Sequence, residues 1–294
     1  MDKQLFLQYL PDEVIEIVQK ECGDFVNKIT EIRLRVGKPI IIYVRGKEKI
    51  LAHKATSSLI KKTIELISGY SMYAWEDELR NGFITLPGGC RVGLCGKVVV
   101  EDEKIKTISN ISGINMRIKH EIKGCANPIL TTLKQIGHTM IISPPGCGKT
   151  TLLRDLARQL SDGGKTVGIV DERSEIAGCY MGVPVNDVGI RTDVLDRCPK
   201  TAGMVMLLRS MSPDVIIADE IGGEQDMRAI EQIVNAGVKI ICTAHGNGIN
   251  DIHESKRLRD LAAVFDNYIV LSSKNGPGTI EGIYNSEFKA VRLC

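Results

Sequence analysis

Residues 138–156 read HTMIISPPGCGKTTLLRDL, and this stretch decides the fold. Met140, Ile141 and Ile142 form a short apolar run that suits a strand buried on both faces. Two prolines and two glycines within residues 143–148 are incompatible with a helix or a central strand. From Lys149 onward the leucines recur at helical spacing. The pattern therefore predicts a strand, a glycine-rich loop and a helix in succession.

A helix that opens with Lys-Thr after such a strand and loop is typical of the phosphate-binding loop (Walker A motif) of nucleoside triphosphatases. Glycines let backbone N–H groups point inward around phosphates, and the N-terminus of the helix adds positive potential. We expect Lys149 to reach the β- and γ-phosphates and the Thr150 hydroxyl to bind Mg²⁺. The first glycine of the motif is replaced by Ser143. The expected nucleotide-binding residues are Ser143, Pro144, Pro145, Gly146, Cys147, Gly148, Lys149, Thr150 and Thr151.

A second informative segment is residues 214–220, DVIIADE, in which an apolar run ends in two acids. Such a segment is typical of the Walker B strand of the same enzymes. We expect Asp219 to hold Mg²⁺ together with Thr150, and Glu220 to polarise the attacking water. A carboxylate beside the Mg²⁺ ligand favours water as the phosphoryl acceptor. The pair therefore predicts hydrolysis rather than phosphoryl transfer to a small molecule.

Two more polar segments follow expected strands. Residues 166–170 precede the acidic run DERSE at 171–175, and residues 239–244 precede His245. Ligands of open α/β sheets bind beyond the carboxyl ends of the strands. We therefore expect Glu172 and His245 in the catalytic site with Lys149 and Glu220. A polar side chain in the position of His245 can touch the γ-phosphate and respond to its loss.

The composition is that of an ordinary soluble globular protein, with 43% hydrophobic residues, 25% charged residues and a net charge of +2. This balance gives no reason to expect a dedicated nucleic-acid surface. The nine cysteines include no C-x-x-C pair, so neither a disulfide framework nor a zinc site is expected. No apolar run approaches the ~18 residues that span a bilayer, and the N-terminus lacks the apolar core of a signal peptide. We expect a cytoplasmic protein.

Two domains are expected, an N-terminal α+β domain at residues 1–126 and a nucleotide-binding domain at residues 127–294. In the second, strands that alternate with helices predict a mostly parallel sheet sandwiched by helices. The polar stretch 120–127 is the candidate linker. Further expected elements are helices at 57–67 and 73–79, strands at 92–100, 105–108 and 114–118, and a long irregular loop at 176–200.

Four arginines of the first domain alternate with apolar residues: Arg33, Arg35, Arg91 and Arg117. Arginine is mostly exposed in proteins, so these side chains fit the solvated face of a sheet. The alternative is that some of them face a nucleotide, bound by the same chain or by a neighbouring one. The sequence alone leaves both readings open.

The run LLRSMSPDVIIADEI at residues 207–221 resembles the Walker B region of the secretion ATPase superfamily. That superfamily shares a phosphate loop, an acid-rich box, a Walker B segment with a catalytic glutamate and a histidine box. The chain has matching segments in the same order at residues 143–150, 171–175, 214–220 and 243–245, and Arg209 also matches. The phrases VDERSEIAGCY (170–180) and NDVGIRTDVLD (186–196) further resemble the stage III AA family of sporulation proteins in endospore-forming bacteria.

The resemblance implies a RecA-like core, ATP and Mg²⁺ as ligands, and a homo-oligomeric motor that forms a hexameric ring. It implies a catalytic role for Arg209, and it makes Arg91 and Arg117 the closest matches to arginines that approach the phosphates. It also implies docking on a membrane protein of a channel complex, at the mother-cell face of the membrane around the forespore. The chain departs from the superfamily at Gly222-Gly223, where an Arg-Asp pair is frequent, and in the residues after His245.

Three other kinds of protein are alternatives to an ATP-driven motor. A nucleic-acid-linked ATPase has support from the sheet arginines, but aromatic residues make up 4% of the chain and no basic stripe is interleaved with them. No direct contact with nucleic acid is therefore expected. A nucleotide-gated scaffold would bind ATP and turn it over too slowly to do work. A small-molecule kinase is disfavoured by the Asp219-Glu220 pair.

Overall fold

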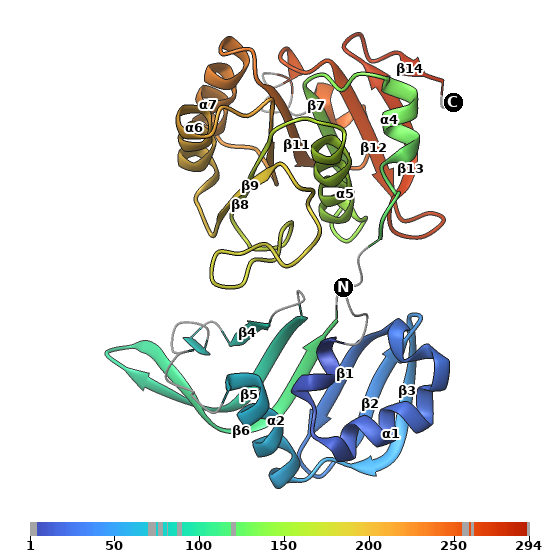
Figure 1. The fold of residues 1–294 in the computed structure, drawn as a ribbon, viewed down its shortest axis with the longest axis vertical. Coiled ribbons are helices and arrows are strands. Elements are labelled where there is room, and N and C mark those ends of the chain that lie inside the picture. Colours follow the sequence, from blue (N-terminus) through green and yellow to red (C-terminus); the bar gives the residue numbers. More distant parts are fainter. Residues whose placement is uncertain are drawn as a thin grey trace. The chain divides into compact units, whose positions relative to one another are not determined.

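A computed structural model describes residues 5–69, 75, 79–80, 82–86, 90–118, 122–254, 259 and 262–292. The chain divides into two compact units, Met1–His120 and Glu121–Cys294, which Figure 1 draws in full. This division falls at the start of the stretch 120–127 that the sequence offers as a linker. The domain boundary after residue 126 stays a prediction. Among the described residues, no helix is both long and apolar enough to cross a membrane.

The first unit is built on a six-stranded antiparallel sheet in the order β3-β2-β1-β6-β5-β4. Its helices α1 and α2 pack apolar residues against the sheet to form one core. The elements are the short 3₁₀ helices Leu5–Tyr9 and Gly23–Lys28, α1 (Asp12–Cys22), α2 (Ser57–Ser68), β1 (Ile29–Arg35), β2 (Pro39–Val44), β3 (Lys47–Lys54), β4 (Phe83–Leu86), β5 (Cys90–Glu101) and β6 (Lys104–Arg117).

Local sequence explains where α2 begins and ends. The Thr56 hydroxyl accepts a hydrogen bond from the Leu59 N–H at 3.1 Å, and Gly69 ends the helix in the left-handed conformation with φ of 57°. The expected helix at 57–67 is thus confirmed. The two strands expected at 105–108 and 114–118 are wrong as separate elements, because β6 is continuous along β5. The helix expected at 73–79 lies mostly outside the described residues.

The second unit contains an eight-stranded sheet in the order β14-β13-β12-β7-β11-β10-β8-β9. Six of its strands are parallel, and β13 and β14 add antiparallel strands at one edge. The mostly parallel α/β sheet expected from the sequence is confirmed. The strands are β7 (Thr139–Ser143), β8 (Val167–Asp171), β9 (Thr192–Asp196), β10 (Val215–Ala218), β11 (Lys239–His245), β12 (Asn267–Ser272), β13 (Thr279–Asn285) and β14 (Ala290–Val291).

Helices cover both faces of this sheet and create two separate cores (Figure 1). Neighbouring residues of one strand point to opposite faces, so Ile141 packs under α4 and α5 whereas Met140 and Ile142 pack under α6 and α7. The helices are α4 (Asn127–Leu133), α5 (Lys149–Asp162), α6 (Lys200–Ser210), α7 (Glu224–Asn235) and the short α8 (Asp251–Glu254).

The sequence predicts one long irregular loop at residues 176–200, and the structure differs there, because Thr192–Asp196 form strand β9. The strand pairs in parallel with β8 and closes one edge of the sheet. All five of its residues are half-buried, and none of the apolar runs that reveal a central strand is present. An edge strand of this kind is stabilised by its neighbour more than by its own sequence.

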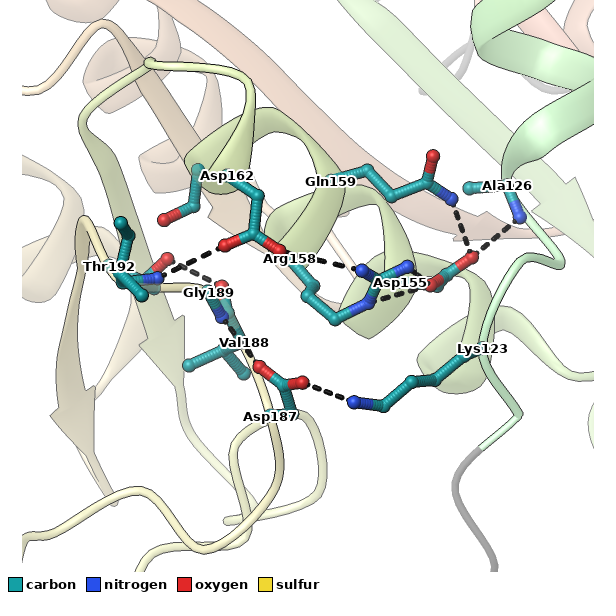
Figure 2. A network of polar contacts seen from close by, with 12 residues as sticks. Lys123, Ala126, Asp155, Arg158, Gln159, Asp162, Asp187, Val188, Gly189 and Thr192 are labelled. Atoms are coloured by element: carbon teal, nitrogen blue, oxygen red, sulfur yellow. Dashed lines mark hydrogen bonds and ion pairs between the residues drawn. The ribbon is translucent and has the colours of Figure 1, made fainter.

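A polar network fastens the start of the second unit to α5 (Figure 2). The buried carboxylate of Asp155 accepts hydrogen bonds from the Ala126 N–H at 2.9 Å, the Gln159 amide at 2.9 Å and the Arg158 guanidinium at 2.7 Å. Gln159 also bonds the Asn127 side chain at 2.8 Å. These hydrogen bonds attach residues 126–127, at the start of the second unit, to α5, the helix that follows the phosphate loop.

Candidate nucleotide site

The predicted site residues of the second unit stand where parallel strands end at one edge of the sheet. β11 lies between β7 and β10, and its last residue, His245, is in register with Ser143 at the end of β7. β10 ends directly before Asp219, and β8 ends directly before Glu172. The topology thus brings the phosphate loop, both acidic segments and His245 to the same edge.

Two glycines shape the phosphate loop. Gly146 and Gly148 have φ of 76° and 88°, in the left-handed region that lets successive N–H groups turn inward. Gly148 is also the N-cap of α5 and has no side chain to cover the free N–H groups of the helix. The Gly278 N–H donates to the Cys147 carbonyl at 2.9 Å, so the turn between β12 and β13 supports the loop.

Lys149 is buried, and its ammonium group is held by the loop itself. It donates to the carbonyl oxygens of Ser143 at 2.9 Å and Pro144 at 3.2 Å. The Ser143 hydroxyl donates to the Pro144 carbonyl at 2.9 Å as well. Carbonyl groups are dipoles without net charge, so the positive charge of Lys149 is left to be balanced by an anion such as a phosphate.

The residues predicted to hold Mg²⁺ lie together. The Thr150 hydroxyl is 3.5 Å from one carboxylate oxygen of Asp219, and the Thr243 hydroxyl bonds the other. Hydroxyl and carboxylate oxygens are ligands that Mg²⁺ prefers, and this ion commonly takes one or two of them with phosphates and waters. No group of three or more His, Cys, Asp or Glu suited to a metal occurs among the described residues. Thr150 and Asp219 supply oxygen atoms of the kind that Mg²⁺ takes together with phosphates and waters, so their chemistry fits this ion.

Glu220 follows Asp219 with an unusual backbone conformation. Its φ is 43°, and its N–H donates both to the Asp219 carboxylate at 2.9 Å and to the Thr243 hydroxyl at 2.8 Å. Its own carboxylate pairs with Arg173 at 2.9 Å, and both side chains are well exposed. The carboxylate thus stands at the sheet edge in contact with solvent, where water can reach it.

The acidic run after β8 forms a tight loop. The buried carboxylate of Asp171 accepts the N–H groups of Glu175 at 2.8 Å, Ile176 at 3.0 Å and Ala177 at 2.8 Å. Arg154 of α5 donates to the carbonyls of Glu175 and Ile176, each at 2.6 Å. Asp171 therefore fixes the shape of the loop through these hydrogen bonds. Arg154 attaches the loop to α5.

Glu172 is half of an ion pair with Lys200, the first residue of α6, at 3.3 Å. Lys200 also donates to the Glu220 carbonyl at 2.7 Å. His245 is exposed at the end of β11, next to the phosphate loop. Of the predicted catalytic residues, Lys149, Glu172, Glu220 and His245 thus stand at the same edge of the sheet.

Arg209 stands apart from this edge within its own chain. It lies nine residues along α6 from Lys200, about 13 Å at the usual helical rise, so α6 leads it away from the strand ends. It lines a surface cavity of about 710 Å³ that runs along α6, from Pro199 and Thr201 at the start of the helix to Arg209. Its catalytic role remains a prediction.

Arg91 and Arg117 belong to the first unit. They face each other in the register of β5 and β6, and Arg91 also stacks over the Phe83 ring at 4.4 Å. Thr151 lies in the first turn of α5, where its carbonyl accepts a weak hydrogen bond from the Cys125 thiol at 3.8 Å. Contact of these residues with a nucleotide remains a prediction.

The sequence assigns no individual role to four residues around the site, although two of them lie within the matched segments 171–175 and 243–245: Arg173, Lys200, Thr243 and Asp226. Asp226 accepts the N–H groups of Gly222 and Gly223, at 2.8 and 2.9 Å, and so holds the turn where the chain departs from the secretion ATPase pattern. Burial would raise the pKa of Asp226, but these N–H groups, with Thr201 and Lys200, lower it below its usual value. Thr243 offered a signal, as a polar residue inside an apolar strand.

Comparison with solved structures defines the class of fold. The DotB ATPase of Yersinia pseudotuberculosis superposes with a TM-score of 0.63 at 14% identity, covering 95% of this chain and 81% of DotB. The pilus retraction motor PilT, solved with bound ADP, superposes with a TM-score of 0.59 at 16% identity, covering 88% of this chain and 76% of PilT. The chain therefore has the RecA-like fold of the secretion and pilus ATPases.

Sequence comparison defines the family. The model of the family "Sporulation stage III, protein AA" matches residues 1–291, and the chain belongs to that family. Stage III sporulation protein AA of Bacillus subtilis is 44% identical over an alignment of 269 residues that covers 88% of each chain. The resemblance inferred from the sequence motifs is confirmed.

Proposed function

We propose that the chain is a Mg²⁺-dependent ATPase that hydrolyses ATP at the carboxyl edge of the larger sheet. The observation that carries this proposal is the gathering of Lys149, Thr150, Asp219 and Glu220 at one edge, around a loop of left-handed glycines. The fold shared with ATPases of known structure supports it.

Each residue has a distinct part in the proposed reaction. The loop N–H groups and Lys149 bind the phosphates, and Thr150 with Asp219 holds Mg²⁺, which neutralises charge on the phosphates when bound. Glu220 orients a water molecule and accepts its proton as the oxygen attacks the γ-phosphorus. His245 lies next to the phosphate loop, where it can contact the γ-phosphate and respond to its departure. ADP and phosphate are the products.

We further propose that this hydrolysis drives a homo-oligomeric ring, a hexamer in the manner implied by the secretion ATPases. Head-to-tail contacts between identical chains close into rings when the rotation between neighbours allows it. The family name supports a task in sporulation, and the similarity to PilT, a pilus retraction motor, supports mechanical work. In this proposal the ring stays in the cytoplasm on the mother-cell side. It attaches to the membrane through a protein of a channel complex, and it makes no direct contact with nucleic acid.

The first experiment is release of phosphate from ATP by the purified full chain, with and without Mg²⁺. We expect turnover that requires Mg²⁺ and that added DNA or RNA leaves unchanged. Stimulation by nucleic acid would favour a nucleic-acid-linked ATPase instead. ATP binding with no measurable turnover would favour a nucleotide-gated scaffold.

The ring is tested separately, by the mass in solution of the Glu220→Gln variant with and without Mg²⁺-ATP. This variant is expected to bind ATP without hydrolysing it. The ATP-bound, assembled oligomer should therefore accumulate. A shift from the monomer to six chains is the expected result. A protein that stays monomeric with ATP bound would contradict self-assembly of the chain driven by nucleotide.

A further inference from the structure

The backbone at Glu220 requires support from its surroundings. A φ of 43° is rare for a residue with a side chain, because the Cβ atom crowds the next carbonyl oxygen. Such a conformation persists where neighbouring groups fix it on several sides. The N–H of Glu220 is fixed by Asp219 and Thr243, and the next N–H, of Ile221, donates to the Thr243 carbonyl at 2.9 Å.

The remaining backbone group, the Glu220 carbonyl, is held by Lys200. The Lys200 ammonium donates to it at 2.7 Å and is 3.3 Å from a Glu172 carboxylate oxygen. The Lys200 side chain is 19% exposed, so these contacts are largely shielded from water. A lysine has three N–H donors and no acceptor, which allows one side chain to join two oxygen atoms from different segments. Lys200 thus connects the acidic loop after β8 with the turn after β10.

The carboxylate of Glu220 has a different kind of partner. It pairs with Arg173 at 2.9 Å, with the two side chains 40% and 63% exposed. Exposed ion pairs contribute little and exchange readily with solvent and other ligands. The structure therefore combines a firmly held Glu220 main chain with a side chain that is free to exchange its partner for water and nucleotide.

We infer that Lys200 is a positioning residue for ATP hydrolysis, which fixes the Glu220 main chain and couples it to the acidic loop. This inference rests on the proposed ATPase function and assigns a role to a residue outside the expected motifs. Lys200 acts through Glu220, since its ammonium is already occupied by the Glu220 carbonyl and Glu172. Loss of Lys200 therefore affects the chemical step and leaves nucleotide binding in place.

The chain offers a matched control for this test. Lys165 pairs with Asp214 at 3.6 Å, just before β10 begins and therefore at the opposite end of the strand from Glu220. Lys200→Met and Lys165→Met each remove one ion-paired lysine charge and keep an unbranched side chain that is only one atom shorter. Only Lys200→Met removes a contact with Glu220.

The first measurement is steady-state ATP hydrolysis by the full chain. Lys200→Met is expected to lower kcat about 10- to 100-fold, because small misplacements of a catalytic group have effects of this size. The KM for ATP should stay within about threefold of the wild-type value, as for an interaction made in the transition state. Lys165→Met should leave both constants within about twofold. If Lys200→Met does not fold, Lys200→Gln replaces it, with the same direction expected.

The second measurement needs no turnover: hydrogen exchange of the backbone amides at residues 220–223. These amides should exchange at least about fivefold faster in Lys200→Met than in Lys165→Met. Unchanged exchange, or a kcat equal to that of Lys165→Met, would overturn the inference. A raised KM with unchanged kcat would do so too, because it would mean that Lys200 binds the nucleotide. If exchange accelerates but the wild-type chain hydrolyses no ATP, the proposed function fails, and the role of Lys200 in positioning Glu220 for hydrolysis fails with it.

Discussion

Helix α5 contains two charged groups that the chain treats in opposite ways. In its first turn, the Lys149 ammonium is hydrogen-bonded to two neutral carbonyl groups. In its middle, the Asp155 carboxylate is paired with the Arg158 guanidinium and further bonded by Ala126 and Gln159. The Asp155 carboxylate is neutralised by the Arg158 guanidinium, so this pair needs no ligand and stabilises the fold. The Lys149 charge is held by carbonyl dipoles of the glycine-rich loop, which leaves it available to an anionic ligand. The comparison distinguishes the proposed phosphate-binding lysine from a carboxylate that serves the fold on the same helix.

The largest effect is expected from Lys149→Ala, which removes the unbalanced charge. The affinity for Mg²⁺-ATP should fall at least about 10²-fold, since truncation of one partner of a buried charge pair has effects of that order. Isothermal titration calorimetry on the full chain measures this affinity. The thermal stability of the variant without nucleotide should change little. Affinity retained at the wild-type level would refute the phosphate-loop assignment.

Asp155→Ala should have the opposite profile, with a loss of stability and little direct effect on nucleotide contacts. It leaves the Ala126 N–H and the Arg158 guanidinium without their buried partner, at a cost of about 2 kcal/mol in the free energy of unfolding. The Tm should fall by roughly 5 °C for a unit of this size.

The matched control for Asp155 is Asp162→Ala on the same helix. Asp162 is 3.5 Å from Arg158, and its side chain is 45% exposed. An exposed pair of this kind is worth less than about 0.5 kcal/mol. If the two variants lose the same free energy of unfolding, the buried carboxylate of Asp155 does not stabilise the protein more than the exposed carboxylate of Asp162, and this prediction is wrong.

A smaller effect distinguishes the two left-handed glycines of the phosphate loop. Alanine at either position is strained, by about 1 kcal/mol. At Gly146 an added Cβ has no neighbour within 4 Å, whereas at Gly148 it lies 3.0 Å from the Gly278 backbone nitrogen. Gly148→Ala should therefore destabilise the protein more than Gly146→Ala in denaturant unfolding without nucleotide. The reverse order would contradict the close packing of the Gly278 turn on the loop.

The smallest expected effect is on the pH dependence of stability: the contribution of Asp155 to the free energy of unfolding should change with pH. Burial would raise the pKa of Asp155, but the Ala126 N–H, the Arg158 guanidinium and other donors lower it below its usual 3.8. A pKa that is lower in the folded protein adds stability above the unfolded value, and this stability is lost as the pH falls through the folded value. The difference in unfolding free energy between wild type and Asp155→Asn should therefore narrow between pH 6 and pH 3. A constant difference over that range would contradict the role of the ionised carboxylate.

The sequence predicts the structure correctly wherever an element depends on a pattern of neighbouring residues. The apolar run before residue 143, the two glycines and the leucines after Lys149 predict β7, the loop and α5, because each depends on residues a few positions apart. The same holds for β10 and the acids that follow it. The parallel sheet then places both segments at one edge, since parallel strands end on the same side.

The sequence was insufficient where contacts join distant segments. β9 is half-buried at a sheet edge and depends on β8 for its hydrogen bonds, so its own residues show no clear period. Lys200 looks like any lysine at the start of a helix, and its role depends on a carbonyl twenty residues later. Arg173 lies in a predicted acidic segment, but nothing in the segment indicates its pairing with Glu220.

The measurement that tests the central claim most directly is ATP turnover by Glu220→Gln beside the wild-type chain at saturating Mg²⁺-ATP. The wild-type chain should release phosphate, and the variant should bind ATP with similar affinity while its turnover falls ~10²-fold or more, as expected for loss of a general base. Glutamine keeps the size of the side chain, so packing at the sheet edge is preserved. Turnover in the variant at the wild-type rate would contradict the assignment of Glu220, and with it the account of this edge as a hydrolytic site.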